Sequence, residues 1–296
     1  MPGRRHARDY EDDATATSLV GLAEIMTALG AYRDALVLIG GWAPYLILQK
    51  FGEPGFFDPG VFDPRVFDTG FAHVGSIDID FVVDPEAIDA DQYATIVGLL
   101  LARGYGPLTG SKFQFQKMIA SLRTGQPHVI RVDFLTPKPL QRRSHRHREI
   151  QHDLQARTLA GAEVALTHWF WHEFDAQLPD GARTHVRVKV ADVVASLALK
   201  GLAIGDRYAE KDAYDIFALC AHYRGGPAAV ADAIRPFRDE DPVRRGLDAI
   251  REKFRNREAE GPTWVAVFLS EGQADESERF RTDAFMTVSE VIALLA

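Results

Sequence analysis

Hydrophobic residues follow two kinds of spacing along the chain, and the balance between them changes near residue 190. Before that point, short apolar or alternating runs of strand length stand between runs of helical spacing. Beyond it, nearly every apolar run has helical spacing. The pattern predicts an α+β fold in which a mixed sheet flanked by helices precedes an all-helical part. We expect a flexible N-terminus over 1–14, a first domain over 15–190 and a helical C-terminal domain over 191–296.

Start and stop signals divide this pattern into individual elements. Glycine, proline and N-capping residues interrupt the apolar runs at most of the expected ends. An aromatic, Pro-rich and Gly-rich stretch at about 51–75 is expected to be an ordered insertion loop. Strands are predicted over 35–39, 76–83, 112–119 and 128–135, with irregular β structure from 159 to 189 that is clearest over 185–190. Helices are predicted over 15–29, from 42 onward, and over 85–103, 192–203, 206–221, 227–237, 241–254, 262–271 and 288–295.

Composition narrows the class of protein. A chain of 296 residues with 46% hydrophobic content can bury a substantial core. Its formal net charge of −8 argues against a whole surface built for nucleic acid. The most apolar stretch, 35–48, is interrupted by Gly and Pro and is too short to cross a bilayer. The single cysteine, Cys220, cannot form an internal disulfide, so we expect it to pack and the protein to be soluble and cytoplasmic.

The segment Ser76-Ile-Asp-Ile-Asp-Phe-Val-Val83 carries the strongest candidate chemistry. In a strand, alternate side chains share a face, so Asp78 and Asp80 point the same way while their apolar neighbours enter the core. Two carboxylates held side by side in an apolar span favour a cation between them. Magnesium suits this arrangement, because it prefers hard oxygen ligands and leaves positions open for phosphates.

Asp133 is the third candidate carboxylate. It stands alone among strand-forming residues in Arg131-Val-Asp-Phe-Leu135. If its strand lies beside the first, Asp133 completes a site for two metal ions about 3.5–4 Å apart. The alternative is an ordinary surface or turn residue near the end of a strand.

A glycine pair lies upstream, where the apolar strand ends. Gly40 and Gly41 are expected to form a turn into a helix, which would let the backbone approach a phosphate closely. Such turns also occur for purely geometric reasons.

Two later helices carry charge in unusual places. Lys200 stands in an apolar helical stretch, where it either reaches the surface or meets triphosphate oxygens. Lys211, Asp212 and Asp215 share a helix at spacings of three and four, which also fits a salt-bridged solvent face.

Taken in order, these segments resemble the nucleotidyltransferase superfamily, and in particular the AbiEii-type and MenT-type toxins of bacterial toxin–antitoxin systems. The matching elements extend from Leu36 to Leu219. The resemblance implies that Asp78, Asp80 and Asp133 hold two Mg²⁺ ions and are catalytic, and that Lys200 is catalytic or binds nucleotide. It also implies that a nucleoside triphosphate is the donor substrate. The residues that it assigns to nucleotide binding are Gly40, Gly41, Ser76, Lys200, Lys211, Asp212 and Asp215.

The acceptor is left open by the sequence. The resemblance favours an RNA end, such as that of transfer RNA, and a cognate antitoxin partner. A basic run containing Arg142, Arg143, Arg146 and Arg148 could hold an RNA backbone, as could the run 183–189, and either could be an ordinary solvated segment. Nucleotidylation of a protein or a small molecule is an alternative.

Two other functions compete with nucleotide transfer. One is a catalytically silent module that binds nucleotides and regulates a partner. The other is a metal-dependent phosphohydrolase, in which His168 and His172, four apart on a helix, would bind the metal. Packing by the aromatic residues between them is the simpler interpretation of that segment.

Overall fold

The computed structural model describes residues 6–10, 12–52, 73–88, 94–139, 146–207, 210–270 and 274–296. Contacts within the chain divide it into two compact units. We name them the sheet unit and the helical unit. The sheet unit comprises the described residues of Asp12–Ala43 and Ser76–Ala191, and the helical unit those of Met1–Glu11, Pro44–Gly75 and Asp192–Ala296.

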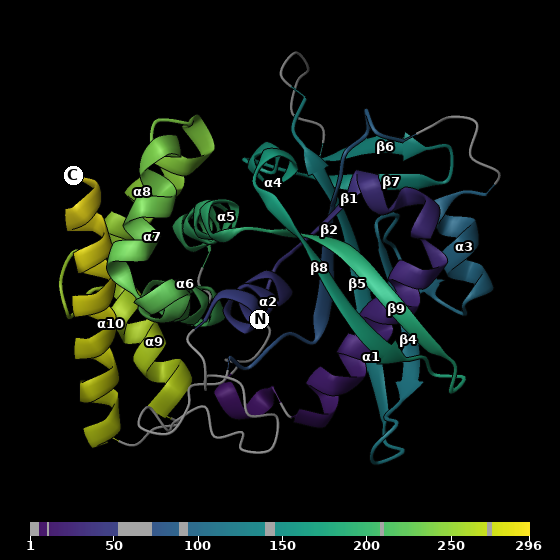
Figure 1. Ribbon diagram of the computed structural model, residues 1–296, viewed down its shortest axis with the longest axis horizontal. Helices are drawn as coiled ribbons and strands as arrows, with labels where there is room; N and C mark the ends of the chain where they lie inside the picture. Colours follow the sequence, from purple (N-terminus) through teal and green to yellow (C-terminus); the bar gives the residue numbers. More distant parts are fainter. Residues whose placement is uncertain are drawn as a thin grey trace. The chain divides into compact units, whose positions relative to one another are not determined.

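The sheet unit is built on one mixed sheet (Figure 1). Over the described residues, the strands follow the order β3-β4-β5-β2-β1-β9-β8, while β7 pairs with β5 and with β6. Strand β1 is antiparallel to β2 and parallel to β9, and β2 is parallel to β5. The strands are β1 (Leu36–Ile39), β2 (Asp78–Val83), β3 (Gly106–Pro107), β4 (Gln114–Ala120), β5 (Pro127–Pro137), β6 (His147–Gln151), β7 (Leu154–Leu159), β8 (Trp169–Gln177) and β9 (Arg183–Ala191).

One face of the sheet is covered by helix α1 (Asp12–Ala28), which contacts β2, β4, β5, β8 and β9. Close packing is possible because Gly21 lies against Ile130, where an added Cβ would be 2.8 Å from the Ile130 Cγ2 atom. The same face carries Phe81 and Phe134, whose stacked rings are 6.1 Å apart. Since side chains alternate along a strand, residues with the opposite parity on β2 and β5 face away from α1.

The other helices of the sheet unit are short. Helix α3 begins after Thr95, whose hydroxyl accepts a hydrogen bond from the Gly98 amide at 3.0 Å. A short 3₁₀ segment, η2 (Gly30–Ala35), leads into β1. The two short helices are α3 (Ile96–Ala102) and α4 (Glu163–Thr167).

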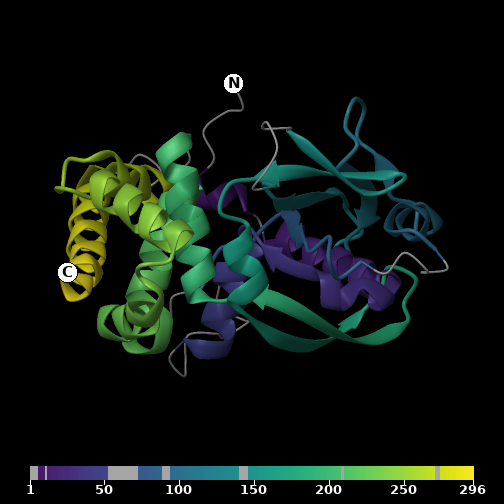
Figure 2. The same cartoon turned by 90° about the horizontal axis from the view of Figure 1, so that it is seen from above.

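The helical unit consists of packed helices, seen from a second direction in Figure 2. Asp192 caps the first helix after the sheet, since its carboxylate accepts hydrogen bonds from the Val194 and Ala195 amides. Helices α5 and α8 cross closely, because Gly201 lies so near Gly246 that an added Cβ would be 2.2 Å from its carbonyl oxygen. The helices are α5 (Val193–Asp206), α6 (Glu210–His222), α7 (Pro227–Ile234), α8 (Asp241–Lys253), α9 (Glu260–Ser270) and α10 (Ala274–Leu295), and the chain division falls within α2 (Trp42–Phe51).

The predicted α+β fold class, with a mixed sheet followed by helices, is confirmed. Among the described residues, no helix combines the length and the apolar character that crossing a membrane requires. The insertion predicted at 51–75 lies mostly outside the described residues.

Several predicted elements are wrong in extent. Of the helix expected over 85–103, the structure has α3 from Ile96 to Ala102. At the expected start, the Asp84 carboxylate instead accepts a hydrogen bond from the Glu86 amide and forms a turn. The β structure expected to be irregular contains a regular hairpin of β8 and β9, paired from Trp169 to Gln177. The last helix is much longer than 288–295, and strands β6 and β7 were not predicted.

Candidate active site

Strands β2 and β5 bring the three predicted carboxylates onto one face of the sheet. Their parallel register places Asp80 directly opposite Asp133. Asp78 lies two residues before Asp80 and shares its face, whereas Ile79 and Phe81 are fully buried on the other face. The alternation predicted from the sequence therefore holds, and the three acidic residues point away from the face that α1 covers.

Gly40 lies against this group of acids. The turn of Gly40 and Gly41 joins β1 to α2, as predicted, and Gly40 has a φ of +70°, which favours glycine. A Cβ added at Gly40 would be 2.1 Å from the Asp80 Oδ2 atom. The missing side chain thus lets the turn approach the Asp80 carboxylate, which a larger residue would displace.

The Asp133 side chain is partly buried and accepts a hydrogen bond from an uncharged donor. The Gln114 side-chain amide donates to its Oδ2 atom at 2.8 Å. Burial raises the pKa of Asp133 above its ordinary value, and the negative charge of Asp78 acts in the same direction, although the Gln114 hydrogen bond opposes them. A raised pKa means that Asp133 binds a proton more readily than an exposed aspartate does.

The side chain of Ser76 supports the start of β2. Its hydroxyl donates a hydrogen bond to the Asp78 carbonyl oxygen at 2.8 Å. This bond fixes the chain just before the acidic pair, and the predicted contact of Ser76 with a nucleotide stays a prediction.

Asp78, Asp80 and Asp133, which we name the carboxylate face, provide the ligand type of a magnesium site but do not form a complete coordination sphere. Carboxylate oxygens are the ligands that Mg²⁺ prefers. Among the residues that the structure describes, however, no three His, Cys, Asp or Glu side chains converge closely enough to hold a metal ion. Binding of Mg²⁺ by Asp78, Asp80 and Asp133 therefore stays a prediction.

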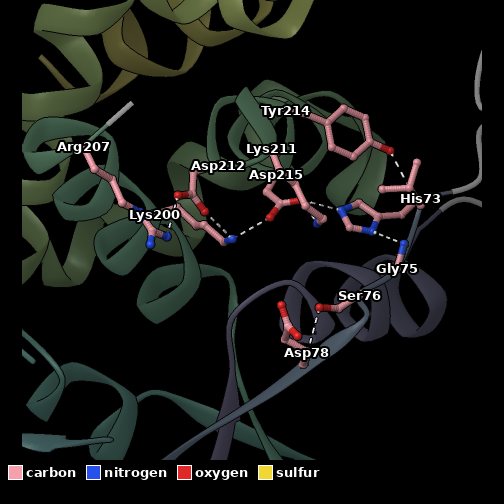
Figure 3. Close-up of polar contacts among 11 residues, drawn as sticks. His73, Gly75, Ser76, Asp78, Lys200, Arg207, Lys211, Asp212, Tyr214 and Asp215 are labelled. Carbon is pink, nitrogen blue, oxygen red and sulfur yellow. Dashed lines mark hydrogen bonds and ion pairs between the residues drawn. The ribbon is translucent and has the colours of Figure 1, made fainter. Parts of the chain in front are cut away.

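In the helical unit, Lys200 lies in a buried network of opposite charges (Figure 3). Its ammonium is 2.7 Å from Asp212 Oδ1 and 2.5 Å from Asp215 Oδ2. Arg207 donates to the second oxygen of Asp212 at 2.9 Å. Lys200 therefore does not reach the surface as a lone lysine usually would, and an incoming phosphate would have to replace one of its carboxylate partners. Its predicted catalytic role stays a prediction.

Asp215 is the centre of this network. Lys211 donates to its Oδ1 atom at 2.8 Å, and His73 lies at 2.8 Å from the same atom. The alternative interpretation of Lys211 and Asp215 as an ion pair on a solvent face is wrong, because the ion pair forms but Asp215 is fully buried. The predicted binding of nucleotide by Lys211, Asp212 and Asp215 stays a prediction. Burial alone would raise the pKa of Asp215, but the charges of Lys200 and Lys211 outweigh it and hold the pKa below its usual range.

His73 is a member of the network that the sequence did not reveal. Its Nδ1 atom accepts a hydrogen bond from the Gly75 amide at 3.1 Å, so the proton of the neutral ring is on Nε2 and is donated to Asp215. Burial lowers the pKa of His73 to about 4. The residue stands alone at the end of the insertion, where the sequence offers no periodicity or motif to mark it.

The predicted basic run is only partly within the described residues. Arg142 and Arg143 lie outside them. Arg146 is exposed, and Arg148 forms an ion pair with Glu86 at 3.2 Å. Binding of RNA by these arginines stays a prediction.

The alternative interpretation of His168 and His172 as metal ligands on one helix is wrong. The segment from Trp169 is strand β8, so His168 precedes it and His172 lies within it. Residues four apart in an extended chain are separated by about 13 Å, too far for one metal ion to bind both.

Comparison with known proteins adds two distant structural neighbours. No protein-family model and no curated protein matches the chain. A solved candidate nucleotidyltransferase from H. pylori is 10% identical, with a TM-score of 0.43, over 96% of this chain and 97% of its own. The solved JHP933 protein from Helicobacter pylori is 12% identical, with a TM-score of 0.40, over 96% of this chain and 94% of its own. What the chain does must therefore be inferred from its own side chains.

Proposed function

We propose that the chain is a magnesium-dependent nucleotidyltransferase. It would move a nucleoside monophosphate from a nucleoside triphosphate to an acceptor hydroxyl. The observation that carries the proposal is the register of Asp80 opposite Asp133 on adjacent parallel strands, with Asp78 on the same face. Neighbouring strands lie about 4.8 Å apart, so side chains on this shared face start from backbone positions close enough for their carboxylates to be drawn around divalent cations.

Each residue of the carboxylate face has a role in this proposal. Asp78, Asp80 and Asp133 would hold Mg²⁺, which when bound neutralises phosphate charge and lowers the pKa of a hydroxyl. Asp133 would accept the proton of the acceptor hydroxyl, a role that its raised pKa favours. The Gly40 turn lies against the Asp80 carboxylate, and its backbone would approach a phosphate of the nucleotide held at that carboxylate.

The proposed reaction is an in-line displacement at the α-phosphorus. A bond forms between the acceptor oxygen and the α-phosphorus, and the bond from that phosphorus to the bridging oxygen of the β-phosphate breaks. The proton of the hydroxyl passes to the base, and pyrophosphate leaves. The preferred acceptor is an RNA end, and the proposed biological role is that of a toxin with a cognate antitoxin.

Label transfer tests this proposal. The purified protein would be incubated with Mg²⁺ and each α-labelled nucleoside triphosphate, separately with total RNA and with cell protein. We expect RNA to be labelled by wild type but not by Asp80→Asn, with pyrophosphate released in equal amount. Label on protein would change the acceptor class, and nucleotide binding without pyrophosphate release would favour the silent regulatory module.

The toxin role has its own test. Expression of the wild-type chain alone should halt bacterial growth, and expression of the Asp80→Asn variant at the same level should not. Equal growth of the two strains would remove the toxin role while leaving the transferase activity to the labelling experiment.

A further inference from the structure

The sheet contains a junction beside Asp133 where two strands meet end to end. Strand β5 pairs on one side first with β4, which places Gln114 opposite Asp133, and then with β7, which places Arg157 opposite Leu135. The start of β4 and the middle of β7 are therefore brought together next to the carboxylate face. Because Leu135 and Asp133 share a face, Arg157 emerges on the same face as the acids.

Three side chains gather at this junction, and we name them the junction cluster: Phe113, His147 and Arg157. The His147 ring lies 5.2 Å from the Phe113 ring at an interplanar angle of 34°. The Arg157 guanidinium lies 5.7 Å from the centre of the Phe113 ring. His147 and Arg157 pair directly in the β6–β7 ladder. The Phe113 ring thus packs against both the His147 ring and the planar Arg157 guanidinium.

The cluster is open to solvent, and its cationic side chain has no ion-pair partner among the described residues. Phe113 is half-buried, whereas His147 and Arg157 are exposed. Among the described residues, neither His147 nor Arg157 forms an ion pair with a carboxylate. The charge of Arg157 also acts on the nearby Asp133 carboxylate. An anionic ligand at Arg157 would therefore lie close to the proposed catalytic acids.

A comparable cluster on β8 and β9 shows the contrast. There Arg187 lies 4.2 Å from the Trp171 ring and Lys189 lies 4.3 Å from the Trp169 ring. Arg187 also pairs with Glu173 at 3.2 Å, and the Lys189 ammonium donates to a backbone oxygen at 2.6 Å. Those two polar groups already have protein partners, Glu173 on the same hairpin and the Asp34 carbonyl oxygen before β1. Within the described residues, the cation of the junction cluster, Arg157, has no such carboxylate partner.

We propose that the junction cluster binds the end of the acceptor RNA. A base would stack on the exposed ring of His147, which Phe113 supports, and a backbone phosphate would pair with Arg157. Stacking on aromatic rings together with basic side chains is the usual way in which proteins hold single strands without sequence preference. The inference rests on the proposed transferase function, and it identifies the residues that would bring the acceptor hydroxyl to Asp133.

Equilibrium binding tests the cluster separately from catalysis. The Asp80→Asn protein would be titrated, without nucleotide, against a fluorescent single-stranded RNA of about 12 nucleotides. His147→Leu in this background removes the ring on which the base would stack, and it should weaken binding roughly five- to a hundredfold, the effect of losing one stacked base. Arg157→Gln should also weaken it and reduce the slope of log affinity against log salt by about 0.7. Arg33→Gln, which removes another exposed arginine of the sheet unit, is the matched control and should change neither.

The outcomes separate the cluster from the enzyme activity. Unchanged RNA affinity in both folded variants, or no RNA binding by the parent, would overturn the proposal. The same substitutions would also be placed in the wild-type protein, and a raised KM for the nucleoside triphosphate or reduced labelling of cell protein at unchanged RNA affinity would likewise overturn it. Weakened RNA binding would support it, even if wild type failed to transfer label and the proposed function were lost. Far-ultraviolet circular dichroism and thermal unfolding would establish that each variant is folded.

Discussion

The two units each contain a group of ionisable residues, but they treat charge in opposite ways. On the sheet, Asp78, Asp80 and Asp133 carry one sign and share a half-buried face. In the helical unit, the acids Asp212 and Asp215 are balanced by lysines and are almost fully buried. The first arrangement contains acids only, which is the basis for proposing that it binds a cation, whereas the second already contains its own cations.

The pKa directions express the same contrast. Burial and the charge of Asp78 raise the pKa of Asp133, whereas the lysine charges outweigh burial and lower the pKa of Asp215. A carboxylate with a raised pKa is less stable in its ionised form, which is a frequent property of functional sites. A buried carboxylate with a lowered pKa, such as that of Asp215, instead has a structural role, because without it the lysines would be buried without a partner of opposite charge. Substitutions in the two regions should therefore affect different measurements.

The largest effect is expected from Asp215→Asn, and it should be on stability. The change removes the carboxylate that pairs with the buried Lys200 and Lys211 ammonium groups. The free energy of unfolding should fall by about 5 kcal/mol, near the upper end of the range for breaking a buried ion pair. Urea unfolding followed by circular dichroism measures it. A loss below about 1 kcal/mol would show that the network does not hold the helical unit together.

Asp80→Asn should show the opposite profile. The amide is almost the same size, so the free energy of unfolding should change by less than about 1 kcal/mol. Transfer of label should fall roughly a thousandfold, since the proposed metal ligand contributes several kcal/mol to charge stabilisation. If activity and stability fell together, the residue would be structural and the contrast between the two regions would disappear.

The pH dependence of stability should report on His73. Its pKa is about 4 in the folded protein and about 6.5 in the unfolded chain, so the unfolded state binds more protons between these values. The contribution of neutral His73 to the free energy of unfolding is therefore fully present above pH 6.5. It is lost as the pH falls to 4, by up to about 3 kcal/mol. Burial is the main cause of the lowered pKa of His73; the charges of Lys211 and Lys200 act in the same direction, and Asp215 opposes them. The Tyr214 ring also packs against the His73 ring.

A substitution isolates the contribution of His73. His73→Gln keeps a donor for Asp215 but does not titrate, so unfolding should depend less on pH between 6.5 and 4. Some dependence should remain, because burial also lowers the pKa of His222 to about 4. Identical pH profiles for wild type and variant would contradict the assignment of a neutral, buried His73.

The smallest of these effects concerns the glycine turn. Gly40→Ala would place a Cβ in the position of the Asp80 carboxylate and strain a backbone with positive φ, at a cost of about 1–3 kcal/mol. The rate of nucleotide transfer should fall by the factor that corresponds to the same free energy, about 1–3 kcal/mol, in the activation barrier, because the Asp80 carboxylate is displaced. Gly30→Ala is the matched control, because nothing lies within 4 Å of its added Cβ. Equal behaviour of the two variants would show that Gly40 does not control Asp80.

Local patterns predicted much of the fold and of the carboxylate face. Alternation in β2 identified Asp78 and Asp80, and the Gly40 turn followed from an apolar run ending in two glycines. The close approach of Gly40 to Asp80 could not be predicted, because it depends on the pairing of β1 with β2.

Other features were missed because they depend on contacts distant in sequence. His73 meets Asp215 across 142 positions, and no spacing rule connects them. The junction cluster arises only because β4 and β7 pair with the same side of β5. The helix expected from residue 85 failed for a local reason, since the Asp84 side chain favours a turn there.

Binding of Mn²⁺, a spectroscopic substitute for Mg²⁺, tests the central claim most directly. Free Mn²⁺ would be measured by electron paramagnetic resonance as protein is added with a non-hydrolysable nucleoside triphosphate. Wild type should remove Mn²⁺ beyond what the nucleotide binds alone, and Asp80→Asn and Asp133→Asn should each bind it at least roughly tenfold more weakly. Binding by both variants with wild-type affinity, or no additional binding by wild type, would contradict the proposal that these acids form a metal site.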